Sequence, residues 1–169
     1  MSKIFLIGMM GSGKSYWVKK LSKKLKVGGY DLDSLIESLE DKSIAEIFAE
    51  DGEAYFRKTE GNVLRWFAEK KAFVVATGGG TPCFNNNMQW MNAQGVTIWI
   101  DEPITTLVER LQPEKAHRPL IKDLSDKMLH EYLTAKRAER ETFYTQATYH
   151  LKGEEISDRS FAQIIQEHA

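Results

Sequence analysis

The sequence predicts an α/β fold built on a parallel sheet. Short apolar runs typical of buried strands alternate with stretches of helical spacing, which is the pattern of parallel sheets covered by helices. The first apolar run, Lys3–Ile7, leads into a glycine-rich segment and then into a helical pattern over residues 16–26. The 169 residues suffice for one domain with a real core. We therefore expect residues 1–169 to form a single domain.

The glycine-rich segment Gly8–Ser15 fits the pattern G-x-x-x-x-G-K-[ST] of the phosphate-binding P-loop, with the strand before it and the helix after it that this motif requires. The glycines let backbone N–H groups point inward, and the helix N-terminus adds partial positive charge. Lys14 can then reach the β- and γ-phosphates of a nucleoside triphosphate, and the Ser15 hydroxyl can hold Mg²⁺. The predicted nucleotide-binding residues here are Gly11, Ser12, Gly13, Lys14, Ser15 and Tyr16.

The other elements follow along the chain. Further strands are expected at 27–33, 72–76, 96–100 and 149–151, of which the first is weak because it contains two glycines. Further helices are expected at 34–40, 44–50, 53–71, 88–92, 104–111, 125–146 and 161–167. Residues 112–123 hold two prolines and three basic residues without periodicity, which predicts a mobile loop.

Composition sets limits on function. Hydrophobic residues make up 42% of the chain and charged residues 28%, and the net charge is −1, so we expect no general attraction to nucleic acid or to an anionic membrane. The single cysteine, Cys83, excludes an intrachain disulfide. No signal peptide and no apolar stretch of about 20 residues is visible. A cytoplasmic location is the expectation.

Asp31 and Asp33 come at the end of the weak strand. Open parallel sheets bind ligands at the carboxyl ends of their strands, so one carboxylate could hold the water shell of Mg²⁺ while the other accepts a proton from a substrate hydroxyl group. Both positions would equally suit aspartates that cap a helix N-terminus. The sequence leaves these two interpretations open.

Two further groups are candidates for ligand binding. Arg57 and Glu60 lie three positions apart on a predicted helix, so they can face each other in a site or form a surface ion pair. Gly78–Gly80 follows the best core strand of the chain. Three consecutive glycines suit a place where a ligand approaches the backbone closely, although they also suit a plain turn.

Late arginines are candidates for anion binding. Arg110 ends a predicted helix, Arg118 lies in the mobile loop, and Arg140 lies in the long helix. An arginine in a closing loop suits the neutralisation of a phosphoryl group during transfer. Any single arginine also has the simpler interpretation of a solvated surface residue, and we interpret Arg137 and Arg159 in that way.

In combination, these segments resemble the shikimate kinases. The resemblance runs from the first strand to Tyr149 and rests on an ordered set of matches. The set comprises the P-loop, Asp31-x-Asp33, the segment 43–48, Arg57 with Glu60, Gly78–Gly80, the segment 117–120 and Arg140. The family fold is similar to that of nucleoside monophosphate kinases. It implies three α/β/α layers, a five-stranded parallel sheet in the order 2-3-1-4-5, and a mobile lid over about residues 112–122.

The resemblance implies transfer of the γ-phosphoryl group of ATP to the 3-hydroxyl group of shikimate, giving shikimate 3-phosphate and ADP on the route to chorismate and the aromatic amino acids. Asp33 would contact the reacting hydroxyl group and act as the base. Lys14 and Arg118 would stabilise charge on the moving phosphoryl group. Ser15 and Asp31 would organise Mg²⁺.

The resemblance also implies a substrate subsite. Arg57 and Arg140 would bind the shikimate carboxylate, and Gly79 and Gly80 would pack against the ring. Arg110 would flank the adenine. Family members are usually monomers, so we expect a monomer. Two alternatives stay open at this point: a related small-molecule kinase such as a gluconate kinase, and a non-catalytic nucleotide-binding module.

Overall fold

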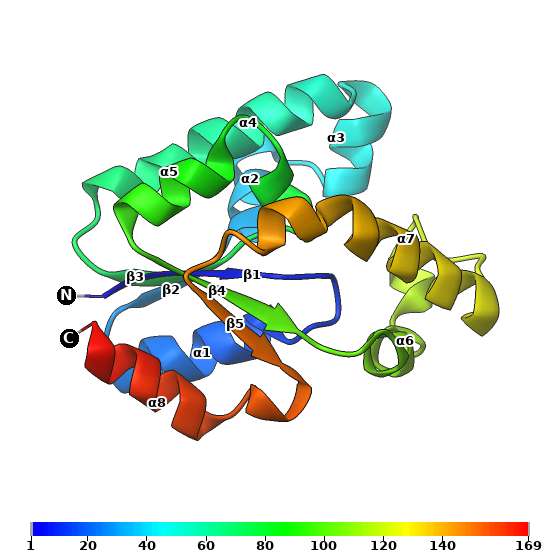
Figure 1. The fold of residues 1–169 in the computed structure, drawn as a ribbon. Helices are drawn as coiled ribbons and strands as arrows, with labels where there is room; N and C mark the ends of the chain where they lie inside the picture. The colour runs from blue at the N-terminus through cyan, green and yellow to red at the C-terminus, as the bar shows by residue number, and fades with distance from the viewer. Residues whose placement is uncertain (1, 169) are drawn as a thin grey trace.

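The computed structural model describes residues 2–168 and contains one five-stranded sheet. The strands are all parallel and lie in the order β2-β3-β1-β4-β5, which confirms the predicted topology (Figure 1). Their bounds are β1 Lys3–Ile7, β2 Gly28–Asp31, β3 Phe73–Ala76, β4 Val96–Asp101 and β5 Tyr149–Lys152. Each strand overlaps a segment that was predicted as a strand, including the weak one at 27–33.

Eight α-helices connect and cover the strands within residues 2–168. Their bounds are α1 Lys14–Leu25, α2 Leu32–Glu40, α3 Ile44–Glu50, α4 Glu53–Arg65, α5 Asn87–Gln94, α6 Ile104–Leu111, α7 Asp126–Tyr144 and α8 Asp158–Glu167. Short 3₁₀ turns are η1 Trp66–Glu69, η2 Thr81–Cys83, η3 Lys115–His117 and η4 Gly153–Glu155.

The largest departure from the predicted helix bounds is in α4, while α7 is shorter than the predicted 125–146 by one residue at its start and two at its end. The spacing favoured a single helix over 53–71, but α4 ends at Arg65 and is followed directly by the 3₁₀ turn η1. This turn brings Phe67 into the core, where its ring lies 4.9 Å from that of Phe73 and 5.3 Å from that of Tyr30. Packing against the sheet therefore overrides the helical periodicity at this point.

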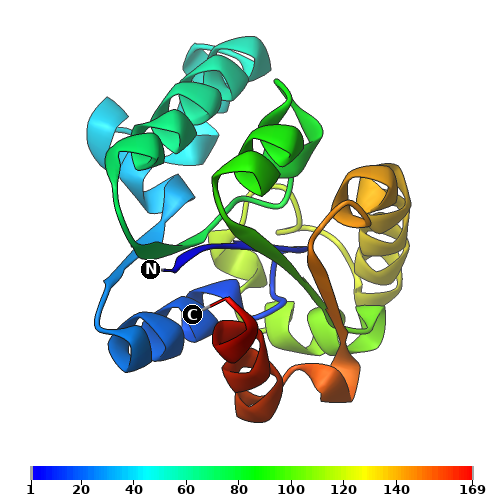
Figure 2. The same ribbon diagram turned by 60° about the vertical axis from the view of Figure 1, so that its left-hand side comes forward.

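The sheet has helices on both faces. Figures 1 and 2 show α1 and α8 on one side and the remaining helices on the other or at the end of the sheet. Side chains of β1 alternate between the two layers: Phe5 belongs to the core under α2–α7, and Leu6 belongs to the core under α1 and α8. Trp17 of α1 and Phe161 of α8 join the second core, with ring centroids 4.4 Å apart.

Strand register brings the predicted site segments to one edge of the sheet. Leu6 of β1 and Asp31 of β2 both pair with Ala76 of β3. The three strands therefore end at the same level, and the chain leaves them into the P-loop, into α2 and into the glycine segment Gly78–Gly80. This is the carboxyl edge at which open parallel sheets bind ligands. Among residues 2–168, no helix combines the length and apolar character needed to cross a bilayer.

Candidate active site

The P-loop begins directly after β1 and ends in the N-terminus of α1. Gly13 caps α1 with φ of 100°, a left-handed conformation that favours glycine. Lys14 folds back over the loop, and its Nζ donates to the carbonyl oxygens of Gly8 (2.5 Å) and Met9 (2.9 Å). The hydroxyl oxygen of Ser12 is buried and has no hydrogen-bond partner in residues 2–168. A phosphate oxygen in the loop would fit both of these polar groups.

The ammonium group of Lys14 is held in an unusual environment. Its pKa is lowered to about 8, chiefly by burial and also by nearby Arg140 and Arg118, whereas the carboxylates of Asp33 and Asp31 oppose this shift. A phosphate bound in the loop would add negative charge beside Nζ and favour the protonated form. The loop therefore suits a phosphate group, whose negative charge keeps Lys14 protonated.

Asp31 caps a helix and also contacts the P-loop. Its Oδ1 caps α2 by accepting from the backbone N–H of Ser34 (3.1 Å), and its Oδ2 accepts from the hydroxyl group of Ser15 (3.0 Å). A hydroxyl oxygen and a carboxylate are hard oxygen donors of the kind that Mg²⁺ prefers. The pair therefore fits a magnesium site that is completed by water and by nucleotide phosphates.

Asp33 lies in the first turn of α2, where Asp31 already provides the cap. The pKa of its carboxyl group is raised to about 6, chiefly by burial and also by the neighbouring carboxylates of Asp31 and Glu60, while Lys14 opposes the shift. A carboxyl group with this pKa is ionised near neutral pH and is a stronger base than an ordinary aspartate. That is the property expected of a general base.

The segment Gly78–Gly80 is a platform against which three site residues lie. A Cβ at Gly78 would meet Oδ1 of Asp33 at 3.0 Å. A Cβ at Gly79 would meet Nη1 of Arg140 at 2.6 Å, and one at Gly80 would meet Nη2 of Arg57 at 2.7 Å. A side chain at any of the three positions would push these groups away from their present places, so the close approach depends on glycine here. The interpretation of a plain turn does not account for these contacts.

Arg57 and Glu60 form the pair that the spacing allowed, but the pair is largely buried. Nη1 of Arg57 donates to Oε1 (3.0 Å) and Oε2 (3.2 Å) of Glu60, which is 1% exposed. The hydroxyl group of Thr81 donates to the same Oε2 at 2.8 Å. The interpretation as a surface ion pair is therefore wrong, because α4 packs this face against the segment after β3.

Arg140 lies near the C-terminal end of α7 and reaches the same segment. Its Nη1 donates to the sulfur atom of Met9 at 3.5 Å. One turn later, the buried hydroxyl group of Tyr144 donates to the carbonyl oxygen of Gly79 at 2.5 Å. Burial raises the pKa of the Tyr144 hydroxyl, so it stays protonated and remains a donor. Sequence analysis assigned no role to this tyrosine, which fastens α7 to the glycine platform.

A cavity of about 510 Å³ joins these parts. It is lined by the P-loop with Tyr16, by Asp31 and Asp33, by Thr77–Gly79, and by Arg110, Glu114 and Arg118. Within residues 2–168 its lining does not include Arg57, Gly80 or Arg140. The structure therefore brings the predicted phosphate-binding residues, Asp33 and two late arginines around one space.

Both lining arginines already have protein partners. Nη1 of Arg110 donates to the carbonyl oxygen of Gly11 (3.1 Å), and its Nη2 pairs with Glu102 at 2.8 Å. Arg118 pairs with Glu114 at 3.1 Å in the loop after α6. The position of Arg110 beside the P-loop is compatible with a contact to nucleotide, and Glu102 is a partner that sequence analysis did not identify.

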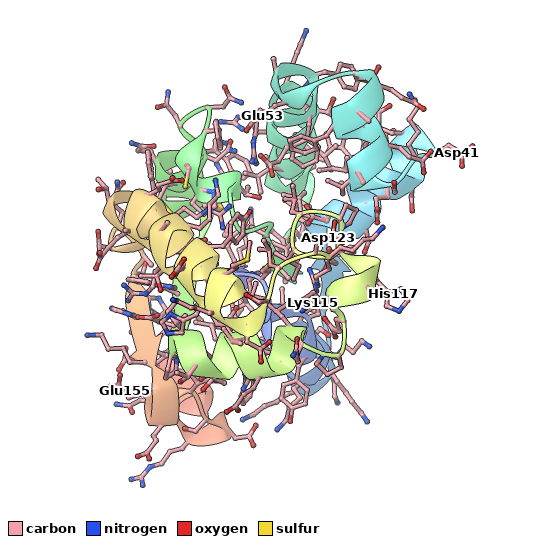
Figure 3. All side chains as sticks on the ribbon, turned by 90° about the vertical axis from the view of Figure 1, so that its right-hand side faces the viewer. Asp41, Glu53, Lys115, His117, Asp123 and Glu155 are labelled. Carbon is pink, nitrogen blue, oxygen red and sulfur yellow. The ribbon has the colours of Figure 1, made fainter. Side chains whose placement is uncertain are left out.

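The loop over 112–123 crosses the open side of the site. Figure 3 labels Lys115, His117 and Asp123 on this segment, which faces the viewer between α6 and the helices α2–α4. Nζ of Lys115 donates to the carbonyl oxygen of Leu124 at 2.6 Å, and Ile121 is fully buried. These contacts anchor the C-terminal end of the loop.

The interpretation of Arg137 as a solvated surface residue is wrong. Its Nε (3.2 Å) and Nη2 (2.7 Å) bind the carboxylate of Asp101 at the end of β4. The same carboxylate is 2.7 Å from Nε2 of His150, whose ring stacks on Trp99 at 3.8 Å between centroids. These residues are far apart in sequence, so only the packing of α7 beside β4 and β5 creates the pair. Arg159 is exposed, as expected.

The described residues 2–168 contain no group of three or more His, Cys, Asp or Glu side chains placed to hold a metal ion.

Comparison with known proteins identifies the family to which the chain belongs. The sequence model described as "SKI: Shikimate kinase" matches residues 10–169. The chain belongs to the shikimate kinase family. A curated shikimate kinase of Bacteroides thetaiotaomicron is 40% identical over 171 residues, covering 99% of this chain and 98% of that protein. The family assignment makes this protein a kinase, as the P-loop and the ordered motifs predicted.

Solved structures agree in fold as well as sequence. The crystal structure of the shikimate kinase from Bacteroides thetaiotaomicron has a TM-score of 0.89 and 39% identity, covering 99% of this chain and 97% of that one. A shikimate kinase from Acinetobacter baumannii in complex with shikimate has a TM-score of 0.85 and 28% identity, covering 99% and 92%. The predicted P-loop kinase fold of this family is therefore confirmed, and neither a gluconate kinase nor a non-catalytic binding module is favoured.

Proposed function

We propose that this protein transfers the γ-phosphoryl group of ATP to the 3-hydroxyl group of shikimate, giving shikimate 3-phosphate and ADP. The observation that carries the proposal is the platform Gly78–Gly80, against which Asp33, Arg140 and Arg57 lie beside the P-loop. The acceptor needs a base for its hydroxyl group and cations for its carboxylate, and these three side chains provide both. The relative from Acinetobacter baumannii was solved with shikimate bound.

At the acceptor end, Arg57 and Arg140 bind the carboxylate of shikimate through charge-assisted hydrogen bonds. Gly79 and Gly80 leave room for the ring to lie on the backbone. Asp33 accepts the proton of the 3-hydroxyl group as its oxygen attacks phosphorus, and the bond between phosphorus and the β,γ-bridging oxygen breaks. ADP leaves with the electrons of that bond. Positioning and charge neutralisation supply most of the catalysis, because phosphoryl transfer needs little covalent help.

At the nucleotide end, the backbone of Gly11, Ser12 and Gly13 and the ammonium group of Lys14 hold the phosphates. The predicted contact of Tyr16 is supported by its place in the lining of the cavity. Arg118 neutralises charge on the phosphoryl group in transfer, and Arg110 flanks the adenine. Both arginines line the same cavity as Lys14.

Ser15 and Asp31 would hold Mg²⁺, directly or through its water shell. The ion would supply charge neutralisation at the β- and γ-phosphates. The residues themselves contribute a fixed geometry, since Asp31 is tied to the N-terminus of α2 as well as to Ser15.

Three further statements belong to the same proposal. Residues 1–169 form one domain with a lid at about 112–122, because one sheet carries all the site segments. A monomer is sufficient, because every residue that we assign comes from one chain. A cytoplasmic location fits a reaction that consumes ATP. Light scattering on the purified protein tests the oligomeric state.

A coupled assay of ADP release tests the reaction itself. With ATP and Mg²⁺ present, shikimate is expected to support turnover and gluconate is not. Turnover with gluconate alone would favour the alternative kinase. ATP binding without turnover on either acceptor would favour a non-catalytic module.

The lid is expected to become ordered when both substrates bind. Hydrogen exchange over 112–122 should slow when a non-hydrolysable ATP analogue and shikimate are added together, because the basic residues of the loop then face bound phosphates. Equal exchange in free and doubly bound protein would contradict a closing lid.

Arg118→Ala should lower kcat by about 10²- to 10³-fold and change the KM for shikimate little, since the arginine acts on the phosphoryl group in transfer.

Activity should fall on the acid side of neutrality. Since burial raises the pKa of Asp33 to about 6, its carboxylate is ionised above that pH and protonated below it. We therefore expect kcat/KM for shikimate to be half-maximal near pH 6 and to fall about tenfold per pH unit below it. A profile that stays flat down to about pH 5, well into the range where Asp33 is protonated, would remove this aspartate as the base.

A further inference from the structure

A buried polar chain lies behind Arg57 and ends at Thr81. The hydroxyl group of Thr81 donates to Oε2 of Glu60 at 2.8 Å, and Nη1 of Arg57 donates to both oxygens of that carboxylate. Thr81 is 0% exposed and Glu60 is 1% exposed, so water does not replace either contact. Glu60 therefore depends on two donors from the protein, and only one of them is the arginine.

We propose that Thr81 is a positioning residue for the phosphoryl acceptor: its hydroxyl group fixes the carboxylate of Glu60, and Glu60 in turn fixes the guanidinium group of Arg57. The inference rests on the proposed function, in which Arg57 binds the carboxylate of the acceptor. Thr81 itself touches neither substrate in this scheme.

Thr81 is suited to this task because its own backbone is fixed. Its N–H donates to the carbonyl oxygen of Gly78 at 3.1 Å, which closes the turn that carries the glycine platform. Its carbonyl oxygen accepts from Nδ2 of the buried Asn87 at 2.9 Å. Nη1 of Arg65 in turn donates to Oδ1 of Asn87 at 2.7 Å. Thr81 is thus held by α4 through its hydroxyl group and by α5 through its carbonyl oxygen.

The same turn links the two halves of the acceptor site. Gly80 immediately precedes Thr81, and a Cβ at Gly80 would lie 2.7 Å from Nη2 of Arg57. The backbone of the turn therefore limits Arg57 from one side, while Thr81 limits it through Glu60 from the other. A guanidinium group confined in this way loses little entropy when it binds a planar carboxylate.

The charge on Glu60 is part of the arrangement. Burial raises the pKa of Glu60, and this shift is opposed by the ion pair with Arg57 and by the hydrogen bond from Thr81. From other elements, Arg140 of α7 also favours the ionised form, whereas Asp33 of α2 faces Glu60 as a like charge. Cys83 of η2 is a further titratable neighbour. Loss of the hydroxyl donor removes one of the groups that keep Glu60 ionised.

The test compares Thr81→Val, which keeps the shape and removes the hydroxyl group, with Thr81→Ser, which keeps the hydroxyl group. For Thr81→Val we expect the KM for shikimate to rise about fivefold, and kcat and the KM for ATP to change less than about twofold. The ratio of variant to wild-type KM should grow as the pH is lowered, because Glu60 is then protonated first in the variant. Thr81→Ser should restore both the KM and its pH profile.

A matched control is Thr97→Val in β4. Thr97 is also fully buried, and its hydroxyl group donates to Oδ1 of Asn92 at 2.6 Å and accepts from the N–H of Thr148 at 2.8 Å. This variant should lower the melting temperature without a pH-dependent change in the KM for shikimate. Equal changes of KM in Thr81→Val and Thr97→Val would show a general structural effect and overturn the inference.

Two outcomes separate this inference from the proposed function. If Arg57→Lys raises the KM for shikimate while Thr81→Val behaves as wild type at every pH, only the role of Thr81 is wrong. If shikimate is not phosphorylated, or if Arg57→Lys leaves its KM unchanged, the assignment of the acceptor site fails first.

Discussion

Asp33→Asn is expected to lower kcat by about 10²- to 10⁴-fold, the usual contribution of a positioned general base. Asparagine keeps the shape of the side chain but cannot accept the proton of the acceptor hydroxyl group. The KM for ATP should change little, because Asp33 lies against Gly78 on the acceptor side of the cavity. Steady-state kinetics at saturating shikimate and ATP measure the effect.

The matched control is Asp41→Asn. Asp41 follows α2 on the exposed surface, and its φ of 54° is a conformation that asparagine adopts readily (Figure 3). This variant should retain wild-type kcat. The acid limb near pH 6 should disappear in Asp33→Asn and persist in Asp41→Asn. A kcat of Asp33→Asn within about threefold of wild type would leave proton transfer to the phosphate itself, since a base contributes far more than that.

Arg57→Lys and Arg140→Lys should each raise the KM for shikimate by about tenfold or more, which corresponds to about 1.4 kcal/mol. Lysine retains the positive charge but loses the planar fork that can bind both oxygens of a carboxylate. The KM for ATP should stay within about twofold in both variants, since within residues 2–168 neither arginine lines the cavity that contains the P-loop. Arg159→Lys on the exposed surface of α8 serves as the control and should leave both KM values unchanged.

Methyl shikimate, an ester without the negative charge, extends this test. It should be a poor substrate of the wild-type protein, because each charge-assisted hydrogen bond that it loses contributes roughly 1.5–3 kcal/mol. The penalty relative to shikimate should shrink in Arg140→Ala, which has already lost its part of the contact. A collapse of ATP binding in these arginine variants, with shikimate binding retained, would instead place the arginines in the phosphate site.

Local sequence was sufficient to predict the strands and the P-loop. The strand Lys3–Ile7 and the loop that follows it are governed by apolar runs and glycines within a few residues, and these signals act without help from distant parts of the chain. Helix ends were less predictable. The end of α4 at Arg65 depends on where Phe67 finds space in the core, which is decided by residues of β2 and β3.

The alternatives at Asp31 and Asp33 show a different limit. Spacing alone could not separate a helix cap from a site residue, and in the structure Asp31 caps α2 while it also accepts a hydrogen bond from Ser15 of the P-loop. The raised pKa of Asp33 results first from burial, which depends on the surrounding elements and not on neighbours in the sequence. The interpretation of Arg137 as a solvated surface residue was wrong for the same reason, because its partner Asp101 lies on another element.

By itself, the sequence determined the α/β class, the position of the phosphate-binding loop and, through the ordered set of motifs, the resemblance to shikimate kinases. Only the tertiary structure decided which of the candidate residues meet. The parallel register ends β1, β2 and β3 at one level, and the packing of α4 and α7 then brings Arg57 and Arg140 against Gly80 and Gly79. Contacts between residues so distant in the chain arise from packing of complete elements, so no local pattern records them.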